Sequence, residues 1–486
     1  MKPENYPDSP KDLWNIFYDF TQTPRPSKNE GKIREYLVNL ATSHKLKHIV
    51  DTAGNVIIYV PGKNGRENDE PVIIQNHIDM VTDALHNVEI NFDLDPIQTK
   101  VEGEWLKAVG TTLGADNGIG CAAGLATIFD QTLVHPPLEL LFTVDEETGL
   151  NGALNLEEKY LSGKKMLNLD TEEWGSLYIG CAGGIDYELN KEVELASATD
   201  GLIPVKIQIE GLIGGHSGVD IHEQRANAIK LIAEYLGELN SVCNFEIAEF
   251  RGGKAHNIIP RDAFVVLYLD SADMAHLKAV ETKMMSRWKA YLPKVDHNVT
   301  MVIQEDPATT GKVLANANEE NTKLLSYLGL FPHGVHSYDL EDRGLVSMSN
   351  NLARFLLVNG KMYTQSSLRF FDREEVRQLE EQVKSLGALF EMNVENHSEY
   401  PSWKPVRQNP VLELVKEAYS ELYGINANVT AIHAGLECGI LRDKIGPLDV
   451  VSFGPTIMGA HSPDERVHIP SVNKFWDLFS LVLKKI

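Results

Sequence analysis

The chain has 486 residues, a formal net charge of −24 and a hydrophobic fraction of 43%. This length exceeds what one hydrophobic core usually serves, so we expect more than one domain. The strong negative charge argues against nucleic acid and anionic membranes as partners. The sequence has no apolar run long enough for a membrane span, and its N-terminal residues lack the apolar core of a secretory signal.

The four cysteines, Cys121, Cys181, Cys243 and Cys438, are scattered, and none forms a C-x-x-C pair. So few cysteines in so long a chain predict reduced thiols and a cytoplasmic location rather than a disulfide framework. The same scatter excludes an iron–sulfur cluster or a structural cysteine site for a metal.

The first part of the chain alternates helical and strand patterns. Residues 11–45 contain two helical patterns, and Ser27 is the expected N-cap of the second. The apolar runs in PVIIQNHIDMV and LELLFTVDEE predict buried strands, and GCAAGLATIFD between them predicts a helix. Strands that alternate with helices indicate an α/β sheet covered on both faces.

The C-terminal part returns to this pattern, with helices predicted for NPVLELVKEAYSELYG and SVNKFWDLFSLVLKKI and strands for ANVTAIH and LDVVSFG. We therefore expect residues 1–186 and 400–486 to form one discontinuous α/β domain, with a mixed sheet flanked by helices.

The middle of the chain, residues 187–399, has an α+β pattern that resembles a repeat. The segments HNIIPRDAFVVLYLD and NNLARFLLVNGKMYTQSSLRFFD both lead through strands to an aspartate and then to a helix. We expect an inserted α+β domain that is duplicated. The alternative is that two ordinary α+β stretches look alike by chance.

Five segments place a histidine or a carboxylate where chemistry is expected: His77 with Asp79, Asp116, Glu146 with Glu147, Asp170, and His461. Residues two apart on a strand point the same way, so Asp79 can orient the imidazole of His77. Asp116 is flanked by small residues and can offer both oxygens, as a ligand that bridges two cations must. Four of the five segments lie at or beyond the end of a predicted strand, where open α/β sheets place their sites.

Each segment alone has a plainer interpretation, such as a surface pair, a helix-capping turn or a solvated acidic turn. Together they offer two imidazoles and several carboxylates, a donor set that suits zinc, cobalt or manganese. Burying unpaired carboxylates is costly, and bound cations would offset that cost. The pattern therefore predicts a site for divalent metal ions.

The motifs H-x-D, GADNGIG, FTVDEETG, GGHSG and a C-terminal histidine together resemble the M20 family of metallopeptidases, and within it the aminoacyl-histidine dipeptidase branch. The resemblance covers nearly the whole chain. It implies a two-domain metallopeptidase, with an inserted lid domain, that hydrolyses Xaa-His and other dipeptides. It further implies that Asp116 bridges two divalent metal ions, with zinc expected first and cobalt or manganese as alternatives. His77 and Asp170 would complete one metal site, and Glu147 and His461 the other.

The same resemblance implies roles for further residues. Asp79 would orient His77, and Glu146 would be the general base. His216, in the GGHSG loop that heads a lid helix, would stabilise the transition state after lid closure. Its alternative is a helix-start histidine without a partner.

Two more lid residues would contact the substrate. Asn257 matches a family residue with that role, and Arg369 would bind the C-terminal carboxylate of the substrate through its guanidinium fork. The alternative for Arg369 is a strand-face arginine that pairs with Asp372.

Several positions stay open. Glu172 or Glu173 would bind the amino group of the substrate, and the sequence does not choose between them. His433, His256 and Glu437 would line the pocket or serve the structure.

Two other functions compete with dipeptide hydrolysis. The first is an N-acyl amino acid deacylase with the same metals, and the second is a metal-binding scaffold without catalysis. A scaffold would be expected to lack Glu146 or a ligand, and all are present. The expected partner is a small peptide substrate. A monomer and a homodimer both stay open, because a doubled lid could supply within one chain a contact made elsewhere between chains.

Overall fold

The computed structural model describes residues 2–306 and 311–486, which divide into two compact units. Unit 1 consists of Met1–Cys181, Trp403–Ala431 and Leu436–Ile486, and unit 2 of Ala182–Ser402 and Ile432–Gly435. The predicted boundaries after residues 186 and 399 both fall inside strands, because a strand joins a sheet as a whole. Within the described ranges, no helix combines the length and the apolarity needed to cross a lipid bilayer.

The helices of unit 1 are α1 (Lys11–Gln22), α2 (Gly31–Ser43), α3 (Ala115–Phe129), α4 (Asn151–Leu154), α9 (Pro410–Tyr423), α10 (Glu437–Ile445) and α11 (Ile469–Lys485). Its strands are β1 (Lys47–Val50), β2 (Val56–Val60), β3 (Val72–His77), β4 (Thr99–Glu102), β5 (Trp105–Ala108), β6 (Leu138–Thr143), β7 (Lys165–Asn168), β8 (Ser176–Cys181), β22 (Asn428–Ile432), β23 (Asp449–Ser452), β24 (Ile457–Met458) and β25 (Arg466–His468).

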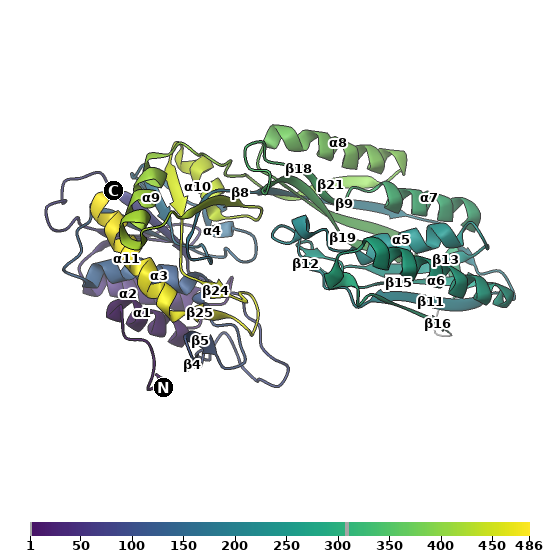
Figure 1. Cartoon of the computed structure of the whole chain (residues 1–486), viewed down its shortest axis with the longest axis horizontal. Coiled ribbons are helices and arrows are strands. Elements are labelled where there is room, and N and C mark those ends of the chain that lie inside the picture. The colour runs from purple at the N-terminus through teal and green to yellow at the C-terminus, as the bar shows by residue number, and fades with distance from the viewer. Residues whose placement is uncertain (1, 307–310) are drawn as a thin grey trace. The chain divides into compact units, whose positions relative to one another are not determined.

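The main sheet of unit 1 has eight strands in the order β1-β2-β6-β3-β7-β23-β8-β22. Figure 1 labels strand β8 of this sheet and the helices α3, α9 and α11 of the same unit. The central strands β6, β3, β7 and β23 run parallel, whereas β1, β2 and β8 pair antiparallel. A mixed sheet flanked by helices confirms the expected fold class. Because the four central strands are parallel, their carboxyl ends lie at one edge of the sheet, where polar side chains can gather.

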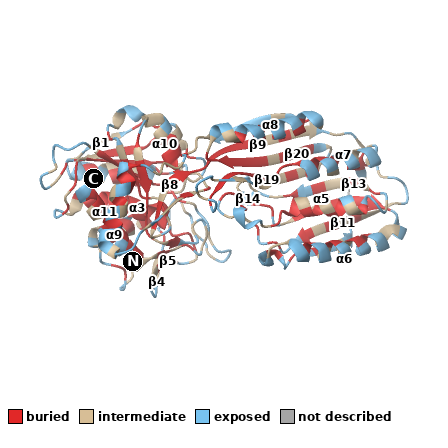
Figure 2. Ribbon diagram, turned by 45° about the horizontal axis from the view of Figure 1, so that its top comes forward, coloured by how far each residue is buried: buried red, intermediate tan, exposed pale blue. Residues whose placement is uncertain are grey.

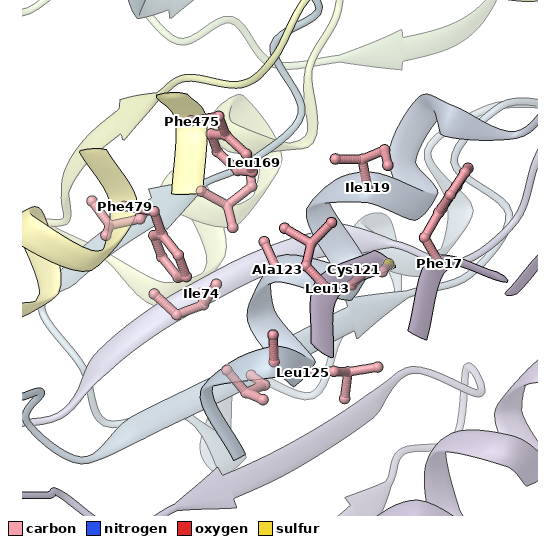
Figure 3. Close-up of a cluster of buried hydrophobic side chains, with 14 of the residues drawn as sticks. Leu13, Phe17, Ile74, Ile119, Cys121, Ala123, Leu125, Leu169, Phe475 and Phe479 are labelled. Carbon is pink, nitrogen blue, oxygen red and sulfur yellow. The ribbon is translucent and has the colours of Figure 1, made fainter. Parts of the chain in front are cut away.

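The core of unit 1 explains the apolar runs in the sequence. Strands β3 and β6 are buried along their whole length, as expected for strands covered on both faces. Figure 3 shows Ile74 of β3 among side chains from three helices: Phe17 of α1, Leu125 of α3 and Phe479 of α11. Burying each such side chain contributes about 1.5–3 kcal/mol, so the helices fix the sheet that carries the site.

The two predicted N-terminal helices are present as α1 and α2, but the N-cap predicted at Ser27 is wrong. Helix α2 begins at Gly31, and its N-cap residue is Glu30. The hydroxyl of Ser27 instead donates to Oδ2 of Asp79 at 2.8 Å. A tertiary hydrogen bond to a buried carboxylate therefore takes the place of the local cap.

The helices of unit 2 are α5 (Ala228–Leu239), α6 (Met274–Tyr291), α7 (Ala317–Leu330) and α8 (Arg373–Leu389). Its strands are β9 (Gly183–Glu192), β10 (Leu195–Ser197), β11 (Ile203–Glu210), β12 (Gly215–His216), β13 (Glu246–Gly252), β14 (Ile258–Ile259), β15 (Ala263–Leu269), β16 (Thr300–Glu305), β17 (Lys312–Leu314), β18 (Gly334–Tyr338), β19 (Val346–Val358), β20 (Lys361–Phe370) and β21 (Asn393–Tyr400).

The large sheet of unit 2 runs β16-β11-β15-β13-β19-β20-β9-β21, with β18 beside β19, and every pairing in it is antiparallel. Figure 2 shows α5, α6, α7 and α8 lying across this sheet. Alternate side chains of β9 and β11, such as Leu189 and Ile207, join these helices in one hydrophobic cluster. Side chains that alternate with these, such as Lys206 and Gln208, are less buried.

Unit 2 contains the same arrangement twice. Elements β11, α5, β13, β15, α6 and β16 form one strand-helix-strand-strand-helix-strand unit, and β9, α7, β19, β20, α8 and β21 form the other. In each, the sheet order is fourth, first, third and second strand. The two copies join where β13 pairs with β19. The repeat read from the sequence corresponds to β15–α6 and β20–α8 of these copies.

Candidate functional site

The predicted ligands of unit 1 lie at the carboxyl edge of its parallel strands. His77 is the last residue of β3, Glu147 follows β6, and Asp170 follows β7. Asp116 lies in the first turn of α3, where its backbone departs from helical angles. His461 lies in the loop between β24 and β25. Segments far apart in the sequence therefore meet because three strand ends, the start of α3 and one loop share one edge.

Asp116 lies between two imidazoles. Its Oδ1 lies 3.1 Å from Nε2 of His77, and its Oδ2 lies 3.2 Å from Nε2 of His461. Nε2 of His77 also lies 3.4 Å from Oδ1 of Asp170, and Nε2 of His461 lies 2.9 Å from Oε2 of Glu147. The arrangement has two halves that share only the carboxylate of Asp116.

The donor atoms fit a pair of small cations. His77, Asp116 and Asp170 form one group of candidate metal ligands, and Asp116, Glu147 and His461 form another, each with ligand atoms within 4.8 Å of one another. A tetrahedral ion with bonds of about 2.0–2.1 Å holds its donors about 3.3 Å apart. The separations of 2.9 to 3.4 Å around Asp116 match that value.

Asp79 supports the imidazole of His77. Its Oδ1 lies 3.3 Å from Nδ1 of His77, which directs Nε2 of that ring toward Asp116. The carboxylate also accepts the backbone N–H groups of Glu146 and Glu147, both at 3.1 Å, and the Ser27 hydroxyl. Burial acts to raise the pKa of Asp79, but His77 first, and then the N–H of Glu146 and the Ser27 hydroxyl, hold it below its usual range, so the carboxylate stays ionised and fixes the ring.

The many carboxyl groups of the cluster repel one another, and this repulsion shifts their pKa values. Burial and the neighbouring carboxylates raise the pKa of Glu146 well above its usual value, and raise that of Asp170 to about 6. Burial also acts on Asp116, yet hydrogen bonds from His461 and His77 hold its pKa well below the usual range. In turn, Asp116 and Glu147 raise the pKa of His461 against the effect of burial. Cations between these groups would relieve the repulsion.

Glu146 lies close to the candidate ligands but belongs to neither of the two groups that share Asp116. One of its carboxylate oxygens lies within 4.8 Å of ligand atoms of His77 and Glu147. Its side chain is partly buried, and its backbone N–H is held by Asp79. A raised pKa next to the ligands is the property expected of a group that takes and returns a proton.

A buried polar chain runs beneath the ligands, and sequence reasoning identified only its end, Glu437. Oε2 of Glu437 accepts hydrogen bonds of 2.5 Å from both Gln75 of β3 and Thr143 of β6. Gln75 accepts from Asn168 of β7 at 2.5 Å, and Asn168 accepts from Ser452 of β23. The chain thus ties together the four parallel strands that carry the site.

The strand patterns could have indicated two members of this chain. Gln75 precedes His77 by two residues and Asn168 precedes Asp170 by two, so each points to the same face as its ligand. Burial raises the pKa of Glu437 to about 8, and its Oε1 has no hydrogen-bond partner among the described residues.

Three residues predicted to act on substrate lie in unit 2, where two of them are adjacent. His216 lies in the short strand β12, which pairs with β14 just after Asn257. The expectation that His216 heads a helix is wrong, because α5 begins only at Ala228. Nδ1 of His216 accepts the N–H of Val219 at 3.0 Å, so the neutral ring carries its proton on Nε2.

Arg369 lies in β20 and is almost wholly buried. Its guanidinium donates to the Tyr400 hydroxyl at 3.1 Å and to the Ser217 hydroxyl at 3.4 Å. Among the described residues, no carboxylate lies within ion-pair distance of Arg369, and the predicted alternative partner Asp372 accepts the N–H of Glu374 as the cap of α8. A buried guanidinium without a carboxylate suits an incoming anion.

The open positions fall into different surroundings. Burial first, and then the charge of the Asp116 carboxylate, raise the pKa of Glu172 well above its usual value. Glu173 is exposed and accepts from Tyr178. His433 is buried in unit 2, where Nε2 lies 2.8 Å from the Ser349 hydroxyl.

Burial, and then the charge of Arg369, lowers the pKa of His433 to about 3, so the ring is neutral. His256 of unit 2 instead pairs through Nδ1 with Asp186 at 2.7 Å. These contacts give both histidines partners within unit 2.

Known proteins are similar to this chain in sequence or in fold. Cytosol non-specific dipeptidase of Escherichia coli (strain K12) is 36% identical over 478 residues, which cover 98% of each chain. The crystal structure of aminoacylhistidine dipeptidase from Vibrio alginolyticus aligns with a TM-score of 0.83 at 37% identity, over 98% of this chain and 97% of that one. Human carnosine dipeptidase 1 aligns over 97% of this chain and 96% of its own with a TM-score of 0.51, and at 11% identity this likeness shows the fold alone.

The match to a family is equally extensive. Residues 73–485 fit the description of peptidase family M20/M25/M40. The matched range contains every residue of the cluster around Asp116 and the three residues of unit 2 predicted to act on substrate. The chain therefore belongs to peptidase family M20/M25/M40.

Proposed function

We propose that the chain is a dipeptidase that uses two divalent metal ions, most simply zinc, with cobalt or manganese as substitutes. The observation that carries this proposal is the position of Asp116, which turns one oxygen to His77 and the other to His461. His77 and Asp170 would hold one ion, and Glu147 and His461 the other. The two extensive relatives of 36% and 37% identity, both named dipeptidases, support the substrate class.

When bound, the two ions would polarise the scissile carbonyl and lower the pKa of a water molecule. Glu146 would accept the proton of that water and return it to the leaving amine. Asp79 would keep His77 in the orientation that points Nε2 at the centre.

Unit 2 would supply binding groups for the rest of the substrate. The Nε2–H of His216 is the form that can donate to a developing oxyanion, because the backbone N–H of Val219 occupies Nδ1. We propose that Arg369 binds the C-terminal carboxylate of the dipeptide and that Asn257, next to β14, contacts its backbone. Free dipeptides would then be preferred over longer peptides, since Arg369 requires a nearby terminal carboxylate.

The amino end of the substrate would be bound by Glu172 rather than by Glu173. Glu172 is the member of the pair that is influenced by Asp116, whereas Glu173 is exposed and bonded to Tyr178. A free amino group would be required, which distinguishes this activity from deacylation of N-acyl amino acids.

A cytoplasmic location agrees with the four cysteines, all of which are free thiols. It also agrees with the name of the Escherichia coli relative. Xaa-His dipeptides and carnosine are the first substrates to test. The number of chains in the assembly is left open, as either one or two.

The decisive experiment is Glu146→Gln, with metal content and hydrolysis of Ala-His measured on the same sample. We expect two equivalents of metal to be retained and turnover to fall by about 10²–10⁴-fold, the range for a lost general base. Glu158→Gln, at an exposed position, is the matched control and should behave as the wild type. Retained turnover in Glu146→Gln would remove Glu146 from the role of base, and faster hydrolysis of N-acetyl-alanine than of Ala-His would favour the deacylase.

A further inference from the structure

Two buried charged residues outside the ligand set contact the loop that carries Asp116. Glu465 and Arg25 each expose only 2% of their surface. Neither was singled out by the sequence, since Arg25 stands between prolines and Glu465 in a polar loop. Burying a charge without partners is costly, so the hydrogen-bond partners of each residue indicate what it stabilises.

The carboxylate of Glu465 accepts hydrogen bonds from four consecutive backbone N–H groups. Oε2 accepts from Leu113 at 2.6 Å and from Gly114 at 2.9 Å. Oε1 accepts from Ala115 at 2.7 Å and from Asp116 at 3.3 Å. Consecutive N–H groups that converge on one anion form a concave site, so the carboxylate fixes the path of the whole segment.

Arg25 links this segment to the residues that follow β3, through carbonyl groups of both. Its guanidinium donates to the carbonyl oxygens of Ile78 at 3.0 Å and Asp79 at 2.8 Å, and also to that of Gly114. A Cβ atom at Gly114, which has φ of +70°, would lie 2.4 Å from Nη2 of Arg25. The glycine of the GADNG motif therefore makes room for this arginine.

We propose that Glu465 is a positioning residue that, together with Arg25, holds Asp116 so that its two oxygens serve two metal ions at once. Glu465 acts through the backbone of residues 113–116 and touches no substrate. It follows His461 by four residues, so it also ties the loop of one ligand to the loop of another. This inference rests on the proposed two-metal function.

The geometry explains why a looser support would fail. Asp116 must keep one oxygen 3.1 Å from the ring of His77 and the other 3.2 Å from that of His461. A small rotation of its backbone would move both oxygens together and spoil both halves of the centre. The bonds from four amide groups to Glu465, and the bond from Arg25 to the carbonyl group of Gly114, oppose that rotation.

The test compares Glu465→Gln with a buried glutamate of the same kind that lies elsewhere in unit 1. Glu139, near the start of β6, accepts the backbone N–H groups of Ser162 and Gly163 at 3.0 Å and the Ser162 hydroxyl at 2.6 Å. It lies in the strand that ends at the site, but at the opposite end. Glu139→Gln therefore controls for the loss of a buried carboxylate that binds backbone amides.

The measurement is zinc retention by the purified holoenzyme against graded chelator, with circular dichroism to check the fold. For Glu465→Gln we expect zinc to be lost at about 10–100-fold lower chelator, the range for residues that orient ligands. The visible spectrum of the cobalt-substituted protein should change as well. Added zinc should restore kcat with KM unchanged, and Glu139→Gln should lower thermal stability with wild-type zinc retention.

Wild-type zinc retention and an unchanged cobalt spectrum in Glu465→Gln would overturn the inference. If Glu465→Gln does not fold, Arg25→Lys decides, because a lysine cannot reach all three carbonyl groups; retention equal to the wild type would then overturn the inference. Absence of zinc, cobalt or manganese from the wild-type holoenzyme would instead contradict the proposed function, so the two failures are distinguishable.

Discussion

The polar clusters of the two units are built in different ways. In unit 1 the parallel strands β3, β6 and β7 end at one edge, so residues that follow each strand meet there, and the start of α3 and the loop of His461 complete the cluster. In unit 2 every strand of the large sheet is antiparallel, and its cluster is assembled from the face of β20 and the short pair β12–β14. Neighbouring parallel strands end at the same edge of a sheet, so several side chains of one kind can gather there. Neighbouring antiparallel strands end at opposite edges, so fewer strand ends meet at one place.

The clusters also differ in charge. The unit 1 cluster is dominated by carboxylates and is suited to cations. The unit 2 cluster offers donors, namely the guanidinium of Arg369 and the Nε2–H of His216, and suits anions. A dipeptide has both requirements, a carbonyl group to be polarised and a terminal carboxylate to be held. The predictions below test whether each cluster meets its own requirement.

Removal of metal should have the largest effect and should act on unit 1 alone. Dialysis of the enzyme against a chelator is expected to reduce Ala-His hydrolysis to background, and zinc should restore it. Bound zinc at 100 times its Kd would stabilise its unit by about 2.7 kcal/mol. Calorimetry should therefore show the unfolding of unit 1 moving to lower temperature. An equal shift in both units would contradict the division of roles.

Arg369→Ala should have the next largest effect, through the substrate carboxylate. A charge-assisted hydrogen bond contributes about 1.5–3 kcal/mol, so kcat/KM for Ala-His should fall by roughly 10–100-fold. The amide of the same dipeptide, which has no terminal carboxylate, should be hydrolysed at nearly equal rates by both enzymes. Arg354→Ala, a second arginine of the unit 2 sheet, is the matched control. Equal losses for the free acid and the amide would remove Arg369 from carboxylate binding.

Glu437→Gln should act on stability, visible as a change in its pH dependence in the metal-free protein. The pKa of Glu437 is raised from 4.5 to about 8 in the folded state, chiefly by burial. Between these values the unfolded chain loses the proton that the folded chain keeps, so the wild type loses stability as pH rises. Glutamine removes this loss.

The free energy of unfolding of the variant, relative to that of the wild type, should therefore rise by up to about 1.4 kcal/mol for each pH unit between pH 5 and 8. Urea unfolding at four pH values measures the difference. The exposed Glu158→Gln should show no such trend, and a parallel pH dependence for Glu437→Gln and the wild type would refute the prediction.

Local sequence determined the elements and the identity of the candidate ligands. Apolar runs predicted β3 and β6 because strands buried on both faces need apolar residues throughout. The candidate ligands were predicted from the combination of donor type and position after a strand, because His77 or Asp170 alone has a plainer interpretation. The repeat in unit 2 was readable for the same reason, since each copy carries its own strand and helix pattern.

The supports of the site depended on the tertiary structure. Ser27 is a residue type that often caps helices, yet its hydroxyl donates to Asp79. His216 lies in a short strand that the glycine-rich sequence around it does not predict. The local sequence around Glu465 indicates a solvated acidic residue. In the folded chain its carboxylate instead accepts the amides of residues 113–116. The periodicity of a sequence predicts which face is apolar, but the partner of a buried polar group comes from a distant segment. The sequence alone thus predicted which residues are candidate metal ligands, and only packing decided which side chains hold them in place.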